Sequence, residues 1–447
     1  MGRWMSPADA VWIRGDTPQN QVLISAVLWF DGPLDVGQLE RILEERLLAR
    51  HPVFAQRIVS LPVPTLMPRW IDDDDFAIGD HLEIVDLPPP GDHELLQDLC
   101  SEERSTPLDT DKPLWSVTLY RGYRGEGSAL HVRIHHSYGD GLALMQLLLS
   151  LVDEFDPETV PVIDPMPLGS HARALTRQAL QEARGVVRHP RHGIELARQV
   201  ADIAGWSARL LRPVPAPASP LQGRPEGRKR MAWSPDGLPV EALLATAHDY
   251  GVKANDLLLT IMTGGLRRYL DERESVVDDV LVMVPINLRP PGMALPRHLG
   301  NLIGLMPVLL PVGRDDPEER LARIREQTSH LKTSRAPAVS RGLLVATTLV
   351  TPTVERAIHR LNQRYSTGVV TNVIGPDMGL HLAGARMMGA IGWGGVTGNL
   401  NLGAGFISVG GRVFGGVVTD TAITPDPERM LTHLEAEWGE LVGTEPA

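Results

Sequence analysis

The sequence of 447 residues contains a single cysteine, Cys100, and no run of about eighteen apolar residues. One cysteine excludes an internal disulfide framework and is typical of a reducing compartment. The missing apolar run excludes an ordinary transmembrane helix, and the first seven residues lack the apolar core of a signal peptide. We therefore expect a cytoplasmic protein.

Several functional motifs are also missing. No GxGxxG or GxxxxGK[ST] loop is present, so nothing supports a nucleotide-phosphate cradle. There is no GxSxG turn, and Cys100 has neither a histidine nor another base near it in sequence, so no covalent enzyme intermediate is indicated. The net charge of −12 argues against a nucleic-acid partner.

The length favours two or three domains, because single cores rarely grow beyond about 250 to 300 residues. Strand and helix patterns alternate in both halves, which predicts an α/β protein. Strands are expected at 22–30, 115–120, 129–134, 280–286, 302–310, 369–374 and 404–409, and helices at 94–104, 142–152, 239–250, 254–270, 317–331 and 427–441. A proline-rich stretch after residue 156 ends the first half, and the second half begins at Met231.

Between the halves lies a basic segment in an acidic protein. Residues 171–230 hold twelve Lys and Arg but only four acidic side chains. Two amphipathic helices are expected between residues 171 and 211, with arginines opposite Leu, Val, Ile and Trp206. Such a pair can lie on an anionic membrane or lipid-droplet surface. Packing of the apolar faces on the protein itself is the alternative, and some of these arginines could meet a phosphate-rich ligand.

The most informative stretch is residues 131–141, where a strand pattern delivers two adjacent histidines into a glycine-containing turn. Strand side chains alternate between faces, so His136 shares a face with Leu130, Val132 and Ile134, whereas His135 points the other way. An imidazole on the apolar face can serve as a neutral base. A metal site is not expected, because His131 and His135 would lie roughly 13 Å apart on a strand.

HHSYGDG, residues 135–141, resembles the HHxxxDG signature of acyltransferases related to chloramphenicol acetyltransferase. Further blocks resemble one branch, the wax ester synthase/diacylglycerol acyltransferase family, over nearly the whole chain. These blocks are MSPADAVWI near the N-terminus, LERILEERLLARHPVFAQRI, PLW before the histidines, then VKANDLLLT, VPINLRP, HLGNLIG, TNVIGP and FGGVVTD. Ser137 and Gly139 stand where bacterial members more often carry alanine and valine.

The resemblance implies an α/β fold of two chloramphenicol-acetyltransferase-like domains, each a mixed sheet with flanking helices, and an active-site tunnel at their interface. The N-terminal domain would span 1–165, the basic helical connector 166–230, and the C-terminal domain 231–447. The reaction implied is acyl-CoA-dependent esterification of a long-chain fatty alcohol or diacylglycerol, giving wax ester or triacylglycerol. Acyl-CoA is a co-substrate, and no cofactor is expected.

The same resemblance assigns roles to individual residues. His136 would be the general base, His135 its support, and Asp140 a structural carboxylate paired with an arginine, for which Arg289 is the best candidate. Further supporting residues would be Asn255 and Asp256. The residues expected to bind substrate are Gly141, Trp115, Asn287, Asn372 and Gly375. Asn287 and Asn372 are candidate oxyanion donors, with a structural amide as the alternative for each.

Two other functions remain open on the sequence. The chain could be a condensation-type acyltransferase that uses carrier-bound acyl groups. It could instead be a non-catalytic lipid-surface or lipid-binding protein that keeps the fold. The sequence indicates neither the oligomeric state nor the preferred acyl acceptor.

Overall fold

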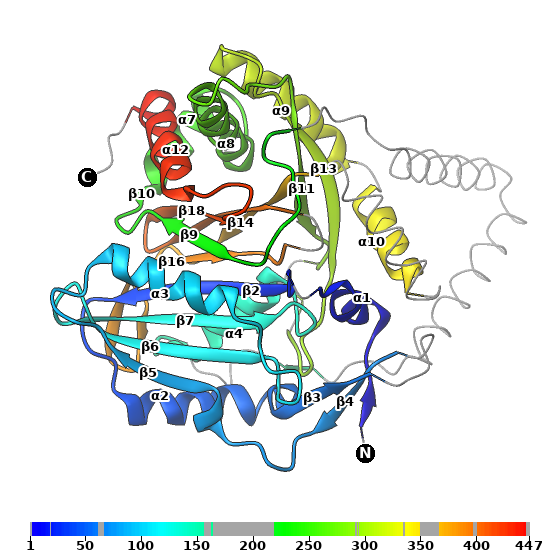
Figure 1. The fold of residues 1–447 in the computed structure, drawn as a ribbon, viewed down its shortest axis with the longest axis vertical. Helices are drawn as coiled ribbons and strands as arrows, with labels where there is room; N and C mark the ends of the chain where they lie inside the picture. Colours follow the sequence, from blue (N-terminus) through cyan, green and yellow to red (C-terminus); the bar gives the residue numbers. More distant parts are fainter. Residues whose placement is uncertain are drawn as a thin grey trace, which may run out of the picture.

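The computed structural model describes residues 2–17, 19–60, 67–155, 162–163, 219–290, 293, 295–333, 336–348, 366–396 and 400–443. Two mixed β-sheets with flanking helices occupy the lower and upper halves of Figure 1. This is the two-sheet α/β fold that the sequence predicts. No helix in the described ranges combines the length and the apolarity that a membrane span requires.

The lower sheet carries the histidine motif. Its strands, in spatial order, are β15 (His381–Leu382), β16 (Ala385–Trp393), β2 (Leu23–Phe30), β7 (Gly127–His135), β6 (Trp115–Tyr123) and β5 (Leu82–Asp86). β7 is antiparallel to both β2 and β6, so the strand expected at 115–120 lies directly beside the histidine strand. Leu130 and Ile134 of β7 belong to the main core of this half, whereas Ala129 belongs to a second core on the other face.

Helices cover both faces of the lower sheet. On one face lie α2 (Val36–Ile42), the π-helical turn η1 (Leu43–Leu48) and α4 (Gly141–Leu151), which share a core with β2 and β7. On the other face, α3 (His93–Ser105) packs between this sheet and strand β9 (Lys229–Trp233) of the upper sheet. α4 starts where predicted because the Asp140 carboxylate caps it, accepting from the backbone N–H of Ala143 at 3.1 Å.

The upper sheet is built mainly by the second half of the chain. Its order is β10 (Leu238–Pro239), β18 (Arg412–Asp420), β17 (Leu402–Val409), β14 (Gly368–Ile374), β11 (Val280–Asn287) and β13 (Ile303–Leu310), with β9 also pairing to β18. Its helices are α7 (Val240–Asp249), α8 (Ala254–Asp271), α9 (Pro317–Thr333), α10 (Ala336–Thr347) and α12 (Pro427–Val442). α7, α8, α9 and α12 lie close to the predicted ranges, whereas no helix was predicted at α10.

β15 and β16 depart from the predicted division into halves. They follow β14 in sequence, yet β16 pairs antiparallel to β2 in the lower sheet, with Met387 opposite Phe30. The predicted C-terminal domain of 231–447 therefore does not keep to the upper sheet. No strand was predicted at 385–393 because Gly389, Ala390 and Gly392 interrupt the alternation of apolar residues. A Cβ at Gly389 would lie 2.2 Å from the Trp29 ring, so close packing there requires glycine.

Shorter elements complete the description. α1 (Pro7–Gly15), capped by Ser6, packs against α10. The others are β1 (Arg3–Trp4), β3 (Gln56–Val59) and β4 (Arg69–Asp72) in one small sheet, β8 (Val162–Ile163) paired with β12 (Leu295–Pro296), and the turns η2 (Pro52–Ala55) and η3 (Ile78–Asp80). The two helices predicted between 171 and 211 lie outside the described residues.

Candidate active site

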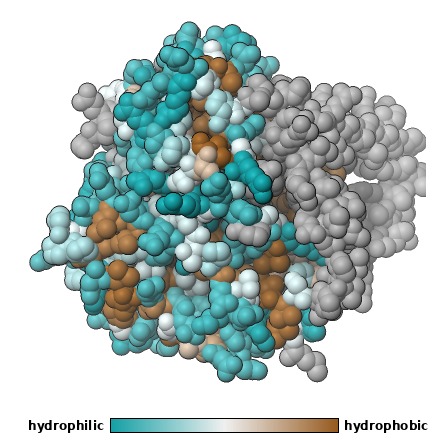
Figure 2. Space-filling model, viewed as in Figure 1, coloured by the Kyte–Doolittle hydropathy of each residue, from teal (hydrophilic) through white to brown (hydrophobic). Residues whose placement is uncertain are grey.

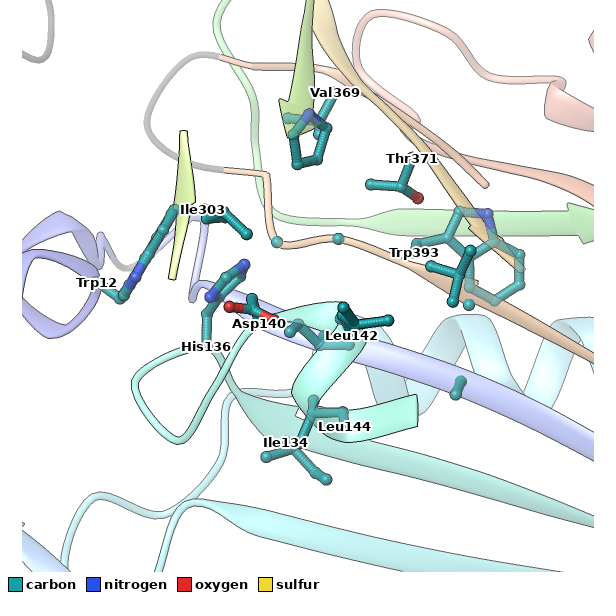
Figure 3. A pocket seen from close by; sticks show the side chains of 18 of the residues that line it. Trp12, Ile134, His136, Asp140, Leu142, Leu144, Ile303, Val369, Thr371 and Trp393 are labelled. Carbon is teal, nitrogen blue, oxygen red and sulfur yellow. The ribbon is translucent and has the colours of Figure 1, made fainter. Parts of the chain in front are cut away.

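A cavity of about 1000 Å³ lies between the two sheets and is lined by both. β7 contributes Val132 and Ile134 from below, and β14 contributes Val369 and Thr371 from above. His136 projects between these two groups (Figure 3). The cavity reaches the upper end of the range of roughly 300 to 1000 Å³ that is usual for ligand pockets.

His136 is the first residue after β7. Its backbone N–H donates to the carbonyl of Val22 at 2.8 Å, and its side chain stacks on Trp12 of α1 with ring centroids 3.9 Å apart. Burial lowers the pKa of His136 well below its ordinary value, opposed by its own carbonyl and by Asp140. Among the described residues, nothing hydrogen-bonds its buried Nδ1. The imidazole is therefore neutral and able to accept a proton.

His135 points to the opposite side, as strand alternation predicts, and does not line the cavity. The backbone N–H of Ser137 donates to its Nδ1 at 3.1 Å, and the Ser137 hydroxyl lies 2.8 Å from the same nitrogen. Nε2 therefore carries the proton, and it lies 3.1 Å from the Asp16 carboxylate. Because both ring nitrogens are occupied, this geometry fits a supporting residue.

Asp140 and Arg289 form the predicted ion pair. Both carboxylate oxygens lie 2.6 Å from one guanidinium nitrogen, and both side chains are almost fully buried. The same carboxylate accepts from the backbone of Leu302 at 2.8 Å, and Arg289 donates to the carbonyl of Gly300 at 2.7 Å. Asp140 borders the cavity, but its oxygens are occupied by these contacts and by the α4 cap.

The segment from Gly300 to Leu302 holds the histidine turn from the other half of the chain. Gly300 donates from its backbone to the carbonyl of Tyr138 at 2.9 Å. The Asn301 amide donates to the carbonyl of His136 and to the carboxylate of Asp9, each at 2.9 Å. Sequence reasoning missed Asn301 and Asp9. They lay inside two of the blocks that carry the family resemblance, and no spacing pattern connects residues so far apart.

Of the five residues predicted to bind substrate, four line the cavity and one does not. Gly141, Trp115, Asn287 and Asn372 line the cavity, so their placement agrees with a substrate-binding role. Gly375 is not among the lining residues; its N–H donates to Ser408 at 2.8 Å, and a Cβ there would lie 2.4 Å from that carbonyl. Close packing of β14 against β17 explains this glycine.

Asn255 and Asp256 lie in the first turn of α8 and do not line the cavity. The buried Asp256 carboxylate accepts from the backbone of Lys253 at 3.3 Å, which caps the helix. Their placement agrees with structural support.

Cys100 and His131 lie on the far face of the lower sheet. Cys100 is fully buried, and burial raises the pKa of its thiol well above the ordinary value, which leaves it unreactive. His131 is paired with Glu103 at 3.0 Å. Neither residue reaches the cavity.

Two mixed sheets enclosing a histidine cavity define the chloramphenicol-acetyltransferase-like fold. The chain belongs to the wax ester synthase/diacylglycerol acyltransferase family: residues 5–258 match the model of its catalytic domain, and residues 299–441 match that of its C-terminal domain. A probable diacylglycerol O-acyltransferase of Mycobacterium tuberculosis is 26% identical over 98% of this chain and 95% of its own length.

Solved structures share the fold. The wax ester synthase/diacylglycerol acyltransferase from Marinobacter aquaeolei superposes with a TM-score of 0.67 at 21% identity, covering 99% of this chain and all of the other. The first condensation domain of the calcium-dependent antibiotic synthetase superposes with a TM-score of 0.61 at 18% identity, covering 100% and 98%.

Proposed function

We propose that this protein transfers an acyl group from acyl-CoA to the hydroxyl of a long-chain alcohol or diacylglycerol, with His136 as the general base. The observation that carries the proposal is the neutral, buried imidazole of His136 in a large, mostly apolar cavity. Family membership and a relative named as a diacylglycerol O-acyltransferase support the reaction class.

The chemistry needs only one base. His136 accepts the hydroxyl proton while the alcohol oxygen attacks the thioester carbonyl, and a C–O bond forms. The tetrahedral oxyanion then collapses, the C–S bond breaks, and the imidazolium returns its proton to the thiolate. Asn287 and Asn372 line the cavity and remain the candidate oxyanion donors.

A thiol-release assay tests the proposal with palmitoyl-CoA and either hexadecanol or dioleoylglycerol as acceptor. The wild type should release CoA only when an acceptor is present. The acceptor that supports turnover shows whether the product is a wax ester or a triacylglycerol. His136→Ala should lower turnover by about 10² to 10⁴, the usual range for loss of a general base. His248→Ala is the control, because that histidine side chain is 90% exposed and does not line the cavity. Near wild-type turnover by folded His136→Ala would refute the assignment.

A further inference from the structure

Two buried polar atoms at the histidine turn have no hydrogen-bond partner among the described residues: Nδ1 of His136 and Oδ1 of Asn301. Buried polar groups are nearly always paired in native proteins, so such a case calls for an explanation. Both side chains are almost fully buried, in a molecule whose visible face in Figure 2 is mainly hydrophilic, so bulk water is not their partner. An imidazole N–H can donate and an amide oxygen can only accept, which makes the two atoms complementary.

The orientation of the Asn301 amide follows from its other contacts. Its nitrogen lies 2.9 Å from the carboxylate of Asp9 and 2.9 Å from the carbonyl of His136. Both neighbours accept, so the nitrogen must face them, and the oxygen is the atom that remains. Burial is the main influence on the pKa of His136 and lowers it, whereas the Asn301 side chain raises it. An acceptor beside an imidazole N–H has this effect.

A sharp turn of the chain places Asn301 here. Leu299 and Gly300, just before it, have positive φ angles of 51° and 104°. A leucine rarely adopts this conformation, and strained residues of this kind cluster at functional sites. Gly300 forms a bridge with Gly139 of the histidine turn, and the backbone N–H of Asn301 donates to Asp9 at 3.0 Å. The turn therefore holds the Asn301 amide against the histidine turn.

The titratable neighbours of His136 are engaged elsewhere. The carboxylate of Asp140 is paired with Arg289, and both ring nitrogens of His135 are occupied. The carbonyl of His136 itself also opposes the lowering of the pKa by burial, and this carbonyl accepts from the Asn301 amide. Asn301 thus acts on the imidazole through its oxygen and by fixing that carbonyl. In Figure 3 the ring rises from the end of β7 towards the cavity.

We propose that Asn301 is a positioning residue for His136: its amide oxygen accepts from the Nδ1–H, so that Nε2 takes the hydroxyl proton. The tautomer of a histidine is set by the bond that its other nitrogen makes. Nδ1 is enclosed by protein, which leaves Nε2 to face the cavity that His136 lines. Hydrogen bonds within catalytic sites are often long before substrate binds and shorten in the reacting complex. The inference rests on the proposed function for the identity of the proton donor.

The tautomer of His136 can be measured directly. In protein labelled with ¹⁵N in the histidine rings, the shifts of the two nitrogens show which one carries the proton, and the signals missing in His136→Gln are those of His136. At pH 7.5 the wild type should carry the proton on Nδ1. Asn301→Ala should lose this preference. A wild type with the proton on Nε2, or an unchanged tautomer in Asn301→Ala, would overturn the proposal.

Asn401→Ala is the matched control. Asn401 is another buried asparagine, whose amide donates to the Leu221 carbonyl at 3.2 Å and the Thr424 hydroxyl at 2.8 Å, and it does not line the cavity. This variant should be destabilised without a change in the His136 tautomer. Should Asn301→Ala fail to fold, the tautomer of the wild type still decides.

Turnover gives a second readout. Asn301→Ala should lower kcat about 10- to 100-fold with KM little changed, the usual effect of losing one hydrogen bond to a charged group. Folded Asn401→Ala should keep both constants. A change in KM alone, or equal losses of kcat in the two variants, would leave Asn301 a structural residue only.

The two readouts separate this inference from the proposed function. An inactive wild type whose His136 carries its proton on Nδ1, in a manner that depends on Asn301, would exclude the proposed function and keep the positioning role. An active wild type with the proton on Nε2 would do the reverse.

Discussion

His136 is held neutral mainly by burial. Trp12 covers one face of the ring, and the cavity around it is mostly apolar, so the charged imidazolium loses hydration without gaining a strong partner. The negative charge of Asp140 raises the pKa of His136 only slightly, because Arg289 compensates that charge. The imidazole of His136 can therefore accept a proton throughout the neutral range.

The first prediction concerns the pH dependence of kcat/KM. Because the pKa of His136 lies below its ordinary value of 6.5, the proton-accepting form persists below that pH, and the acid limb of the profile should fall below 6.5. Trp12→Ala admits water to the ring and should move the limb up towards 6.5. Trp4→Ala, at a tryptophan that is 44% exposed, is the control. A wild-type limb at or above 6.5 would contradict this account.

The second prediction concerns the Asp140–Arg289 pair. Asp140→Ala leaves a buried guanidinium without its charge partner, which should cost about 3 to 5 kcal/mol of unfolding free energy. Asp86→Ala removes the carboxylate from the exposed pair with Arg121 and should leave the free energy of unfolding almost unchanged. Urea unfolding compares the two. If Asp140→Ala kept full stability and lost only acceptor affinity, a structural role would be wrong.

Residues of the site differ in how far the sequence could predict them. His136, Asp140 and Arg289 carry a local pattern or a family block, and their geometry agrees with the prediction. Trp12, Asp16 and Asp9 act on the site from α1 and the loop after it, and Asp16 meets His135 across 119 residues. No periodicity links positions so far apart, because the contacts exist only once the halves have folded together.

At the scale of elements, the sequence predicted most of the main strands and helices from the regular period of their apolar residues, but it predicted neither α10 nor β18. It also missed β16, in which Gly389 makes room for the aromatic rings of Trp29 and Phe414. The packing that selects small residues there also removes the pattern by which a strand is recognised. The sequence does not distinguish the π-helical turn η1 from an ordinary helix, since hydrogen-bond register cannot be read from composition.

The third prediction tests the fit of β16. Gly389→Ala places a Cβ within 2.2 Å of the buried Trp29 ring and 2.7 Å of Phe414, and overpacking of this kind typically costs about 1 to 3 kcal/mol. Gly379→Ala is the matched control, because no atom lies within 4 Å of its Cβ position. Chemical denaturation followed by tryptophan fluorescence should separate the variants. Equal unfolding midpoints would show that β16 accommodates a larger side chain at position 389 than the structure indicates.

At the scale of the whole molecule, the two halves are joined by polar contacts around the histidine turn and by β15 and β16, two strands of the second half that join the lower sheet. Gly300, Asn301 and Arg289, which contact the turn at Tyr138, His136 and Asp140, all come from the second half. Stability and site geometry are therefore coupled across the interface. The motif order predicted two domains, but it could not show that the lower sheet draws strands from both ends of the chain.

The fourth prediction follows from buried histidines throughout the molecule. Burial lowers the pKa of His51, His81, His93, His131 and His136. The unfolded chain takes up protons near pH 6.5 while the folded chain does not, so this part of the stability is present above 6.5 and is lost as the pH falls below it. Asp9, whose pKa burial raises, acts in the opposite sense.

Melting temperature should therefore fall by a few degrees or more between pH 7.5 and 5.5. His93→Gln should make this decline less steep, whereas the exposed His248→Ala should not change it. A melting temperature that rises over the same interval would show that carboxyl groups such as Asp9 outweigh the histidines.

The place of β16 beside β2 has a consequence for biosynthesis. The ribosome synthesises residues 23–30 long before residues 385–393. The edge of β2 that pairs with β16 therefore stays unpaired until most of the chain has been made. Exposed strand edges are templates for aggregation. A fragment that ends before Ala385 should therefore precipitate unless a chaperone is present. Two separately expressed halves should form a soluble complex only when the second half contains β16.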